Sequence, residues 1–286
     1  MNAYIVDKDI QVIRELRDMT QDDFAKDIGV SRSTIERWEG NEVEISEVNI
    51  EKIYTYAYKH NIHMNSIKEQ LYREDHTNQN HQVLFHGAKS IIDGSLAISK
   101  SKENNDFGRG FYCGETLEQA AMFVSFYPKS SIYIMDFDST NLKGYTFTVN
   151  QEWMLAIAYF RGRLGEYKNT LQIKKLLQKL EDVDYIIAPI ADNRMFQIID
   201  TFIEGEITDE QCRHCLSATN LGYQYVFKTE KALSQIKLLE RCYLCQYEKE
   251  MYKSKRQQDN KVSEDKVKLA RKQYRGQGHY IDEILV

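Results

Sequence analysis

Apolar residues in the first 75 positions recur at spacings of three and four, which is the period of amphipathic helices. We expect a first helix whose inner face consists of Ile10, Ile13, Leu16 and Met19. A second helix begins after Thr20, because Thr20 and Asp23 have the spacing of a capping box, and it ends at Gly29. Ser31 caps a third helix, and two more are expected over 46–60 and 65–72.

The rest of the chain mixes short apolar runs with helical patterns, without the regular alternation of βαβ units, and this favours an α+β fold. Strands are expected over 83–87, 131–137, 145–149, 185–188 and 223–227. Helices are expected over 117–126, 152–159, 171–180, 194–203 and 209–218. From Glu230 to about Arg275 the pattern is helical, with an interruption near Asp259 and Asn260.

These patterns predict an all-α domain (1–75), a polar linker (76–82, HTNQNHQ), an α+β domain (83–240) and a helical C-terminal extension (241–286). The chain has 286 residues, and its 42% hydrophobic and 28% charged content is typical of globular proteins rather than disordered or fibrous ones. It lacks the roughly 18–20 consecutive apolar residues of a membrane span, and Met1–Asp9 lacks the pattern of a secretion signal. We therefore expect a cytoplasmic protein with reduced cysteines and no membrane partner.

The stretch IRELRDMTQDDFAKDIGVSRSTIERWEGN (13–41) resembles the Xre, or lambda-repressor-like, helix-turn-helix family. In that geometry the third helix lies in the major groove of DNA with its N-terminal residues at the base edges. The resemblance implies that DNA is contacted by Gln21, Arg32, Ser33, Thr34 and Arg37. It also implies operator DNA as a partner, bound by a homodimer.

The charge of this domain keeps a second interpretation open. Residues 1–75 hold 10 basic and 16 acidic side chains, whereas strong nonspecific DNA binding needs clustered Lys and Arg. The domain is therefore either a DNA reader or a helical module for dimerisation or for holding a partner protein. The basic runs KSKR (253–256) and KVKLARKQYR (266–275) are interpreted as a solvated helix face, with nucleic acid or an acidic partner as the alternative.

Three pieces of the second domain are informative together: LFHGAK (84–89), DFGRGFYCGETLEQAAMFV (106–124) and LGYQYVFKTEKAL (221–233). Their order and spacing resemble the His-Tyr-Glu branch of the ADP-ribosyltransferase superfamily. Residues 83–240 more closely resemble a bacterial domain family of unknown function thought to share that core, which also carries EWMLAIAYFRG (152–162) and DYIIAPIADNRMF (184–196). The resemblance implies NAD as the substrate and no metal.

It also implies roles for individual residues. His86 would form hydrogen bonds to NAD, and Gly87 would let the backbone approach the nicotinamide amide. Tyr112 would stack on the nicotinamide ring, beside a tight turn made by Gly108 and Gly110.

The chain departs from the family at its third catalytic position, where Gln224 stands instead of glutamate. Glutamine can hold a ribose hydroxyl, but it cannot accept a proton or supply a full negative charge. Three outcomes follow. Another carboxylate substitutes, the acceptor is reactive enough to need no base, or the domain binds a nucleotide without turnover. Candidate substitutes are Asp192, Glu206 and Glu210, although Asp192 also fits a helix cap.

Two CxxC pairs, Cys212–Cys215 and Cys242–Cys245, approach the spacing of a zinc ribbon. Both fall in predicted helices without glycine turns, so plain burial is the favoured interpretation.

The leading hypothesis is an NAD-dependent mono-ADP-ribosyltransferase effector of the toxin or phage-defence type. His86, Tyr112 and Gln224 are its expected catalytic residues. Its helix-turn-helix domain would regulate it, and an antitoxin or regulatory protein is a possible partner. The alternative is a DNA-binding transcriptional regulator whose second domain binds NAD or a related nucleotide without catalysis.

Overall fold

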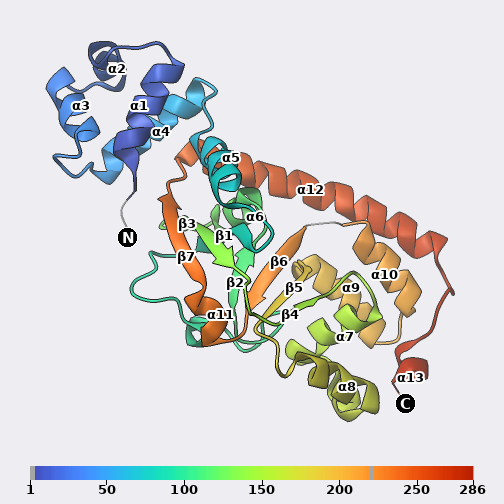
Figure 1. Cartoon of the computed structure of the whole chain (residues 1–286). Helices are drawn as coiled ribbons and strands as arrows, with labels where there is room; N and C mark the ends of the chain where they lie inside the picture. The colour runs from blue at the N-terminus through green and yellow to red at the C-terminus, as the bar shows by residue number, and fades with distance from the viewer. Residues whose placement is uncertain (1–3, 220–221, 286) are drawn as a thin grey trace. The chain divides into compact units, whose positions relative to one another are not determined.

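The computed structural model describes residues 4–219 and 222–285 (Figure 1). The start of the segment Met1–Asp9 and Leu221 of the third motif lie outside the described residues. The chain forms two compact units, and it passes from one to the other several times. Unit 1 consists of Met1–Asp93, Thr116–Phe137 and Lys237–Lys255. Unit 2 consists of Gly94–Glu115, Asp138–Ile236 and Arg256–Val286.

Unit 1 begins with the helices predicted from the apolar periodicity. They are α1 (Val6–Leu16), α2 (Gln21–Ile28), α3 (Arg32–Glu39), α4 (Glu47–Lys59) and α5 (Met64–His76). The predicted caps are confirmed: Thr20 and Asp23 form a capping box, Gly29 adopts a left-handed conformation with φ of 73°, and the Ser31 side chain accepts from Thr34 N. The predicted inner face of the first helix is wrong at two positions: Leu16 is 58% exposed, and Met19 lies beyond the end of α1.

The remainder of unit 1 is built from β1 (His81–Ala88), α6 (Leu117–Val124), β3 (Ser131–Asp138) and β7 (Ile236–Cys242). Its strands lie in the order β1-β3-β7. One buried cluster joins Phe85 of β1 and Ala121 of α6 to Cys242 of β7. The prediction of helix from Glu230 onward is wrong here, because only the short α11 (Glu230–Ser234) precedes strand β7.

Unit 2 carries the other strands and helices of the α+β region. Its elements are β2 (Phe111–Gly114), β4 (Gly144–Thr146), α7 (Gln151–Phe160), α8 (Leu171–Leu180), β5 (Tyr185–Pro189), α9 (Asn193–Ile203), α10 (Asp209–Ser217), β6 (Tyr223–Phe227), α13 (Ile281–Ile284), and the short 3₁₀ helices Ile98–Lys100 and Gly165–Asn169. The strands lie in the order β4-β5-β6-β2, with β4 parallel to β5 and the other pairs antiparallel. This confirms the predicted α+β class.

The core of unit 2 forms around α7, in which the six consecutive residues Trp153–Ala158 are all buried. A helix that is apolar on all sides must be surrounded, and residues of α8, α9, α10 and α13 belong to the same cluster. The C-terminal α13 takes part through Ile281, which is 2% exposed.

The last long helix, α12 (Gln246–Gln273), continues through Asp259 and Asn260, so the predicted interruption is wrong. Neither residue is a glycine or proline, and a weak helix propensity alone does not end a helix. Across residues 4–219 and 222–285, none of the helices is long and apolar enough to cross a membrane.

Candidate functional site

Helix α3 presents a polar N-terminal turn to solvent. Its cap, Ser31, forms hydrogen bonds with the hydroxyls of Ser33 at 2.9 Å and Thr34 at 2.8 Å. Arg32, Ser33 and Arg37 are exposed and Thr34 is half-buried. The opposite face of the helix is anchored by two buried side chains, Ile35 and Trp38. The arrangement exposes two guanidinium groups and a hydroxyl to solvent, although Arg37 lies 4.0 Å from Glu42 and the Ser33 hydroxyl is shared with Ser31.

An ion pair fixes how α3 packs on the helices before it. The guanidinium of Arg14 on α1 donates to both carboxylate oxygens of Glu39 on α3, at 2.5 and 3.0 Å. Gln21 of α2 donates to Glu39 Oε2 at 2.7 Å. The amide nitrogen of Gln21, one of the predicted DNA-contacting residues, therefore already has an acceptor inside the domain. Its position at the start of α2 orients α3.

A buried charge cluster in unit 1 joins the helical domain to strand β7. The ammonium of Lys68 on α5 lies 2.5 Å from Asp9 Oδ2 on α1 and 2.5 Å from Glu240 Oε1 on β7. Tyr54 of α4 donates to Asp9, and Tyr72 donates to Glu240 at 2.9 Å. The three charged side chains are each less than 9% exposed. Sequence reasoning missed this cluster, because nothing in the local pattern distinguishes Lys68 from a surface lysine.

The same contact is reinforced by packing. Cys245, which follows β7, is fully buried in the core of the helical domain, and Tyr243 packs against that core. Asn65 of α5 donates to the Tyr243 carbonyl at 2.7 Å. The helical domain is therefore completed by residues nearly 180 positions further along the chain.

His86 and Gly87 lie on β1 of unit 1, and both are half-buried. A Cβ at position 87 would stand 2.8 Å from the Ala120 carbonyl oxygen and 2.8 Å from Val124 Cγ1. Close packing of β1 on α6 thus accounts for the glycine, without any ligand.

Tyr112 lies on β2 of unit 2, with its hydroxyl turned back onto the preceding loop. It donates to the Gly108 carbonyl at 2.7 Å and accepts from the Phe107 amide at 3.1 Å. Burial raises the pKa of Tyr112 far above its ordinary value, so the phenol stays protonated. The predicted tight turn is present, since Gly108 has φ of 70°. At Gly110, a Cβ would stand 2.7 Å from Val226 Cγ1, so β6 fills that space.

Gln224 lies on β6, which pairs with β2, and it is 8% exposed. Its amide nitrogen donates to Asp106 Oδ2 at 2.9 Å and to the Pro189 carbonyl at 3.3 Å. Asp106 is in turn held by two hydrogen bonds from Arg161, one of 2.9 Å from Nε. Gln224 therefore belongs to a buried group in which the guanidinium neutralises the carboxylate.

Asp106 and Arg161 are the polar residues that sequence reasoning overlooked at this position. Asp106 lies in the motif DFGRGFY and Arg161 in EWMLAIAYFRG. The signal that could have identified them is a charged residue inside an otherwise apolar or glycine-rich stretch. The carboxylates named as substitutes are engaged elsewhere. Asp192 caps α9, as its alternative interpretation predicted, while Glu206 lies 3.6 Å from Arg271 and Glu210 lies 2.6 Å from Arg213.

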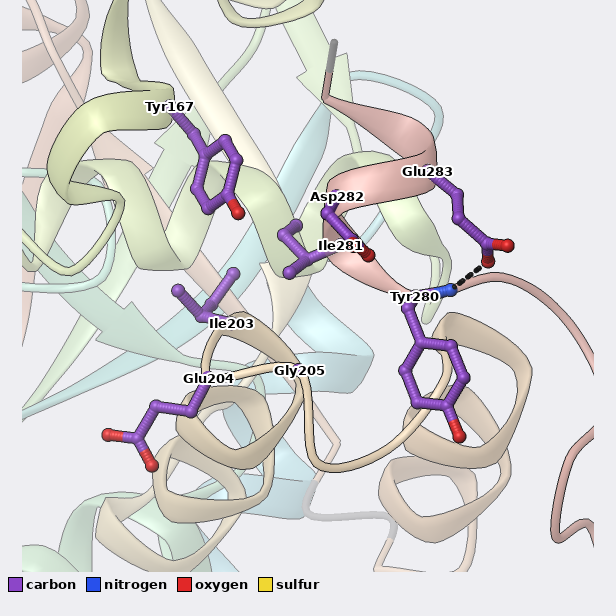
Figure 2. Close-up of a pocket in the computed structure, with 8 residues that line it drawn as sticks. All are labelled: Tyr167, Ile203, Glu204, Gly205, Tyr280, Ile281, Asp282 and Glu283. Atoms are coloured by element: carbon purple, nitrogen blue, oxygen red, sulfur yellow. Dashed lines mark hydrogen bonds between the residues drawn. The ribbon is translucent and has the colours of Figure 1, made fainter.

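Unit 2 also contains two open cavities. The first, of about 450 Å³, is lined by Tyr167, Ile203, Glu204, Gly205, Tyr280, Ile281, Asp282 and Glu283. Figure 2 shows the Tyr167 ring and the Ile203 and Ile281 side chains turned toward a common space, while Glu283 binds the Tyr280 amide. The second, of about 490 Å³, is lined by Phe160, Lys174, Leu177, Gln178, Leu180, Glu181, Ile186 and Lys228. Neither lining includes His86, Tyr112 or Gln224.

The cysteines of both CxxC pairs are buried. Cys212 and Cys215 lie in α10 as predicted, but Cys242 ends β7 and Cys245 precedes α12, so the prediction of a second helical pair is wrong. Burial raises the pKa of Cys212 and Cys242, and that of Cys245 to about 12. In the part of the chain that the structure describes, no three side chains of His, Cys, Asp or Glu converge as metal ligands would.

Comparison with known proteins assigns both regions. Residues 10–53 match the helix-turn-helix family model, which places the N-terminal helices in a class of DNA-binding domains. Residues 82–238 match the model of a protein family of unknown function, DUF3990. That match covers more than half of the chain, so the chain belongs to this family. The chain matches none of the curated proteins and none of the solved structures.

Proposed function

We propose that this protein is a transcriptional regulator that reads DNA with α3, and that its DUF3990 domain binds NAD or a related nucleotide without turnover. The observation that supports DNA reading is the capped α3, with Arg32, Ser33 and Arg37 exposed on one side. Arginine donates two hydrogen bonds to guanine, and serine binds either bases or phosphates. We expect the protein to act in the cytoplasm, as a homodimer on a two-fold operator and under a regulatory partner protein.

The DNA assignment is tested by selecting sites from a random DNA library with the full chain and measuring affinities for the enriched sequence. Replacing Arg32 or Arg37 with Ala is expected to cost about 1–3 kcal/mol each for a base contact and to relax the preference at one position. Lys52→Ala is the matched control, because Lys52 is exposed on α4 and its substitution also removes one positive charge. If no sequence is enriched, or if all three variants lose affinity equally, the reading role of α3 is refuted.

For the nucleotide we retain the residues of the resemblance: His86, Gly87, Gly108, Gly110, Tyr112 and Gln224. The Tyr112 hydroxyl is anchored at both its donor and its acceptor side, which holds the ring in one orientation and suits a stacking platform. The spaces beside Gly87 and Gly110 are filled by protein atoms, so packing by itself already requires glycine at both positions.

What favours binding over turnover is the environment of Gln224. Its amide is committed to Asp106, whose charge is paired with Arg161, so the carboxylate nearest to this position is already neutralised. A transferase needs negative charge directed at the developing oxocarbenium-like centre. The three candidate substitutes, Asp192, Glu206 and Glu210, have partners of their own.

Calorimetric titration of the full chain with NAD, followed by an assay for released nicotinamide, separates the two hypotheses. We expect saturable binding that is weakened by His86→Ala, with no nicotinamide released. Release of nicotinamide, with label transferred to protein or nucleic acid, would establish the second candidate function, mono-ADP-ribosyl transfer. Absence of NAD binding would remove both. A thermal melt of each variant controls for folding.

A further inference from the structure

The second cavity of unit 2 is a groove with apolar walls. Phe160 at the end of α7, Leu177 and Leu180 on α8, and Ile186 on β5 form its walls. Its volume of about 490 Å³ lies within the range of pockets that enclose small organic ligands, roughly 300–1,000 Å³. Its charged residues are Lys174, Lys228 and Glu181, so the lining carries a net positive charge.

Of the two lysines that line the groove, the less exposed is Lys228. It follows β6, it is half-buried, and its ammonium donates to the carbonyls of Phe107 and Arg109. It forms no ion pair with any carboxylate in residues 4–219 and 222–285. Burial lowers the pKa of Lys228 to about 8. The Phe160 ring lies 5.5 Å from the ammonium and supplies a cation–π contact, and Glu181 lines the same groove without pairing with Lys228. An anionic ligand on Lys228 would supply the missing counter-charge.

The donor geometry leaves room for that ligand. An ammonium has three N–H donors, and the two carbonyls use two of them. The third remains for an acceptor in the groove, which Lys228 lines together with apolar walls. By contrast, the first cavity is lined by three carboxylates and contains no cation, so nothing there identifies an occupant.

We propose that this groove binds a small aliphatic carboxylate, with the carboxylate on Lys228 and the hydrocarbon body against Phe160, Leu177 and Ile186. The lining of the groove shares no residue with the nucleotide site proposed above. Because Lys228 also holds the two carbonyls that flank Gly108, the ligand would be sensed by the loop that carries Asp106.

The test is calorimetric titration of the full chain with decanoate, and with decanol as the uncharged equivalent. We expect decanoate to bind saturably and at least about tenfold more tightly than decanol, because charge-assisted hydrogen bonds are the stronger ones. The ammonium form of Lys228 is required. The decanoate association constant should therefore be level at about pH 7 and fall about tenfold per unit above about pH 8, while that of decanol stays constant.

Two variants locate the site. Lys228→Met should bring decanoate down to the affinity of decanol. Leu177→Glu should abolish decanoate binding without touching the bonds of Lys228 to the loop. Lys174→Met, at the exposed rim, is the matched control and should change affinity less than about threefold. Equal binding of decanoate and decanol, no saturable binding of decanoate, or decanoate affinity unaffected by Leu177→Glu in folded protein would each overturn the proposal.

Discussion

Replacing Lys68 with Met is the sharpest test of the contact between the helical domain and β7. Lys68 is 6% exposed and its ammonium lies 2.5 Å from both Asp9 and Glu240. Methionine has a similar volume, so the substitution removes the charge and leaves little cavity. It also leaves two buried carboxylates without a counter-charge, on two elements that the lysine had joined.

The expected loss in the free energy of unfolding is about 3–5 kcal/mol, which is the usual cost of breaking a buried ion pair by removing one partner. A typical domain has only about 5–15 kcal/mol in total, so the change is large. Burial by itself would lower the pKa of Lys68, but Tyr54, Asp9 and Glu240 raise it well above its ordinary value. Stability from this group is therefore fully present below the unfolded pKa of about 10.4 and is lost only as the pH rises through the higher folded value.

The assay is urea denaturation of the full chain, followed by far-ultraviolet circular dichroism. Lys26→Met is the control, since Lys26 pairs with Asp22 on the surface and its loss should leave the midpoint unchanged. The double variant Lys68→Met with Glu240→Met should recover part of the loss, because one of the stranded carboxylates is gone. A loss below about 1 kcal/mol for Lys68→Met would refute the reasoning, since it would mean that water reaches the cluster.

Three further substitutions test the candidate site. Gln224→Glu places a second carboxylate beside Asp106, so it should lower the melting temperature at neutral pH. Asp106 should raise the pKa of the new carboxyl, and stability should recover as the pH falls through that raised pKa. Gly87→Ala forces a methyl to within 2.8 Å of α6 and should cost about 1–3 kcal/mol in urea denaturation; an unchanged midpoint would show that β1 is not packed so closely. Tyr112→Phe leaves the Phe107 amide without its acceptor and should cost about 1–3 kcal/mol, with faster amide exchange in that loop as the second readout.

Much of the fold could be predicted from local signals. Thr20, Gly29 and Ser31 sit where helix caps require them, and the apolar runs around Ile132 and Ile186 became strands as expected. The failure at β7 has a physical cause. The sequence IKLLERC has the charge spacing of a helix, but its tertiary partners decide its conformation. Glu240 is buried against Lys68 and Tyr72 of α5, and Arg241 is buried beside Ser131 of β3, although local reasoning assigns both to the surface.

The candidate site was predicted less completely, because long-range partners determine what each side chain does. Gln224 was picked out from the sequence, yet its partner Asp106 lies 118 positions away and no local pattern joins them. Gly87 and Gly110 fit both a ligand role and a packing role in sequence, and only the atoms around them distinguish the two. Lys228 lies in the third motif, but the sequence assigned it no role, because the burial that lowers its pKa cannot be read from local sequence.

The lysine shared by Asp9 and Glu240 also constrains how this architecture can be rearranged. Exchanging the helix-turn-helix domain for one from another protein would leave Glu240 without its counter-charge, unless the incoming domain supplied a lysine at the place of Lys68 and an acid to match it. The helix-turn-helix domain and β7 therefore cannot be exchanged independently of each other. Substitutions along α3 leave this charge cluster intact, whereas replacement of the whole helix-turn-helix domain does not.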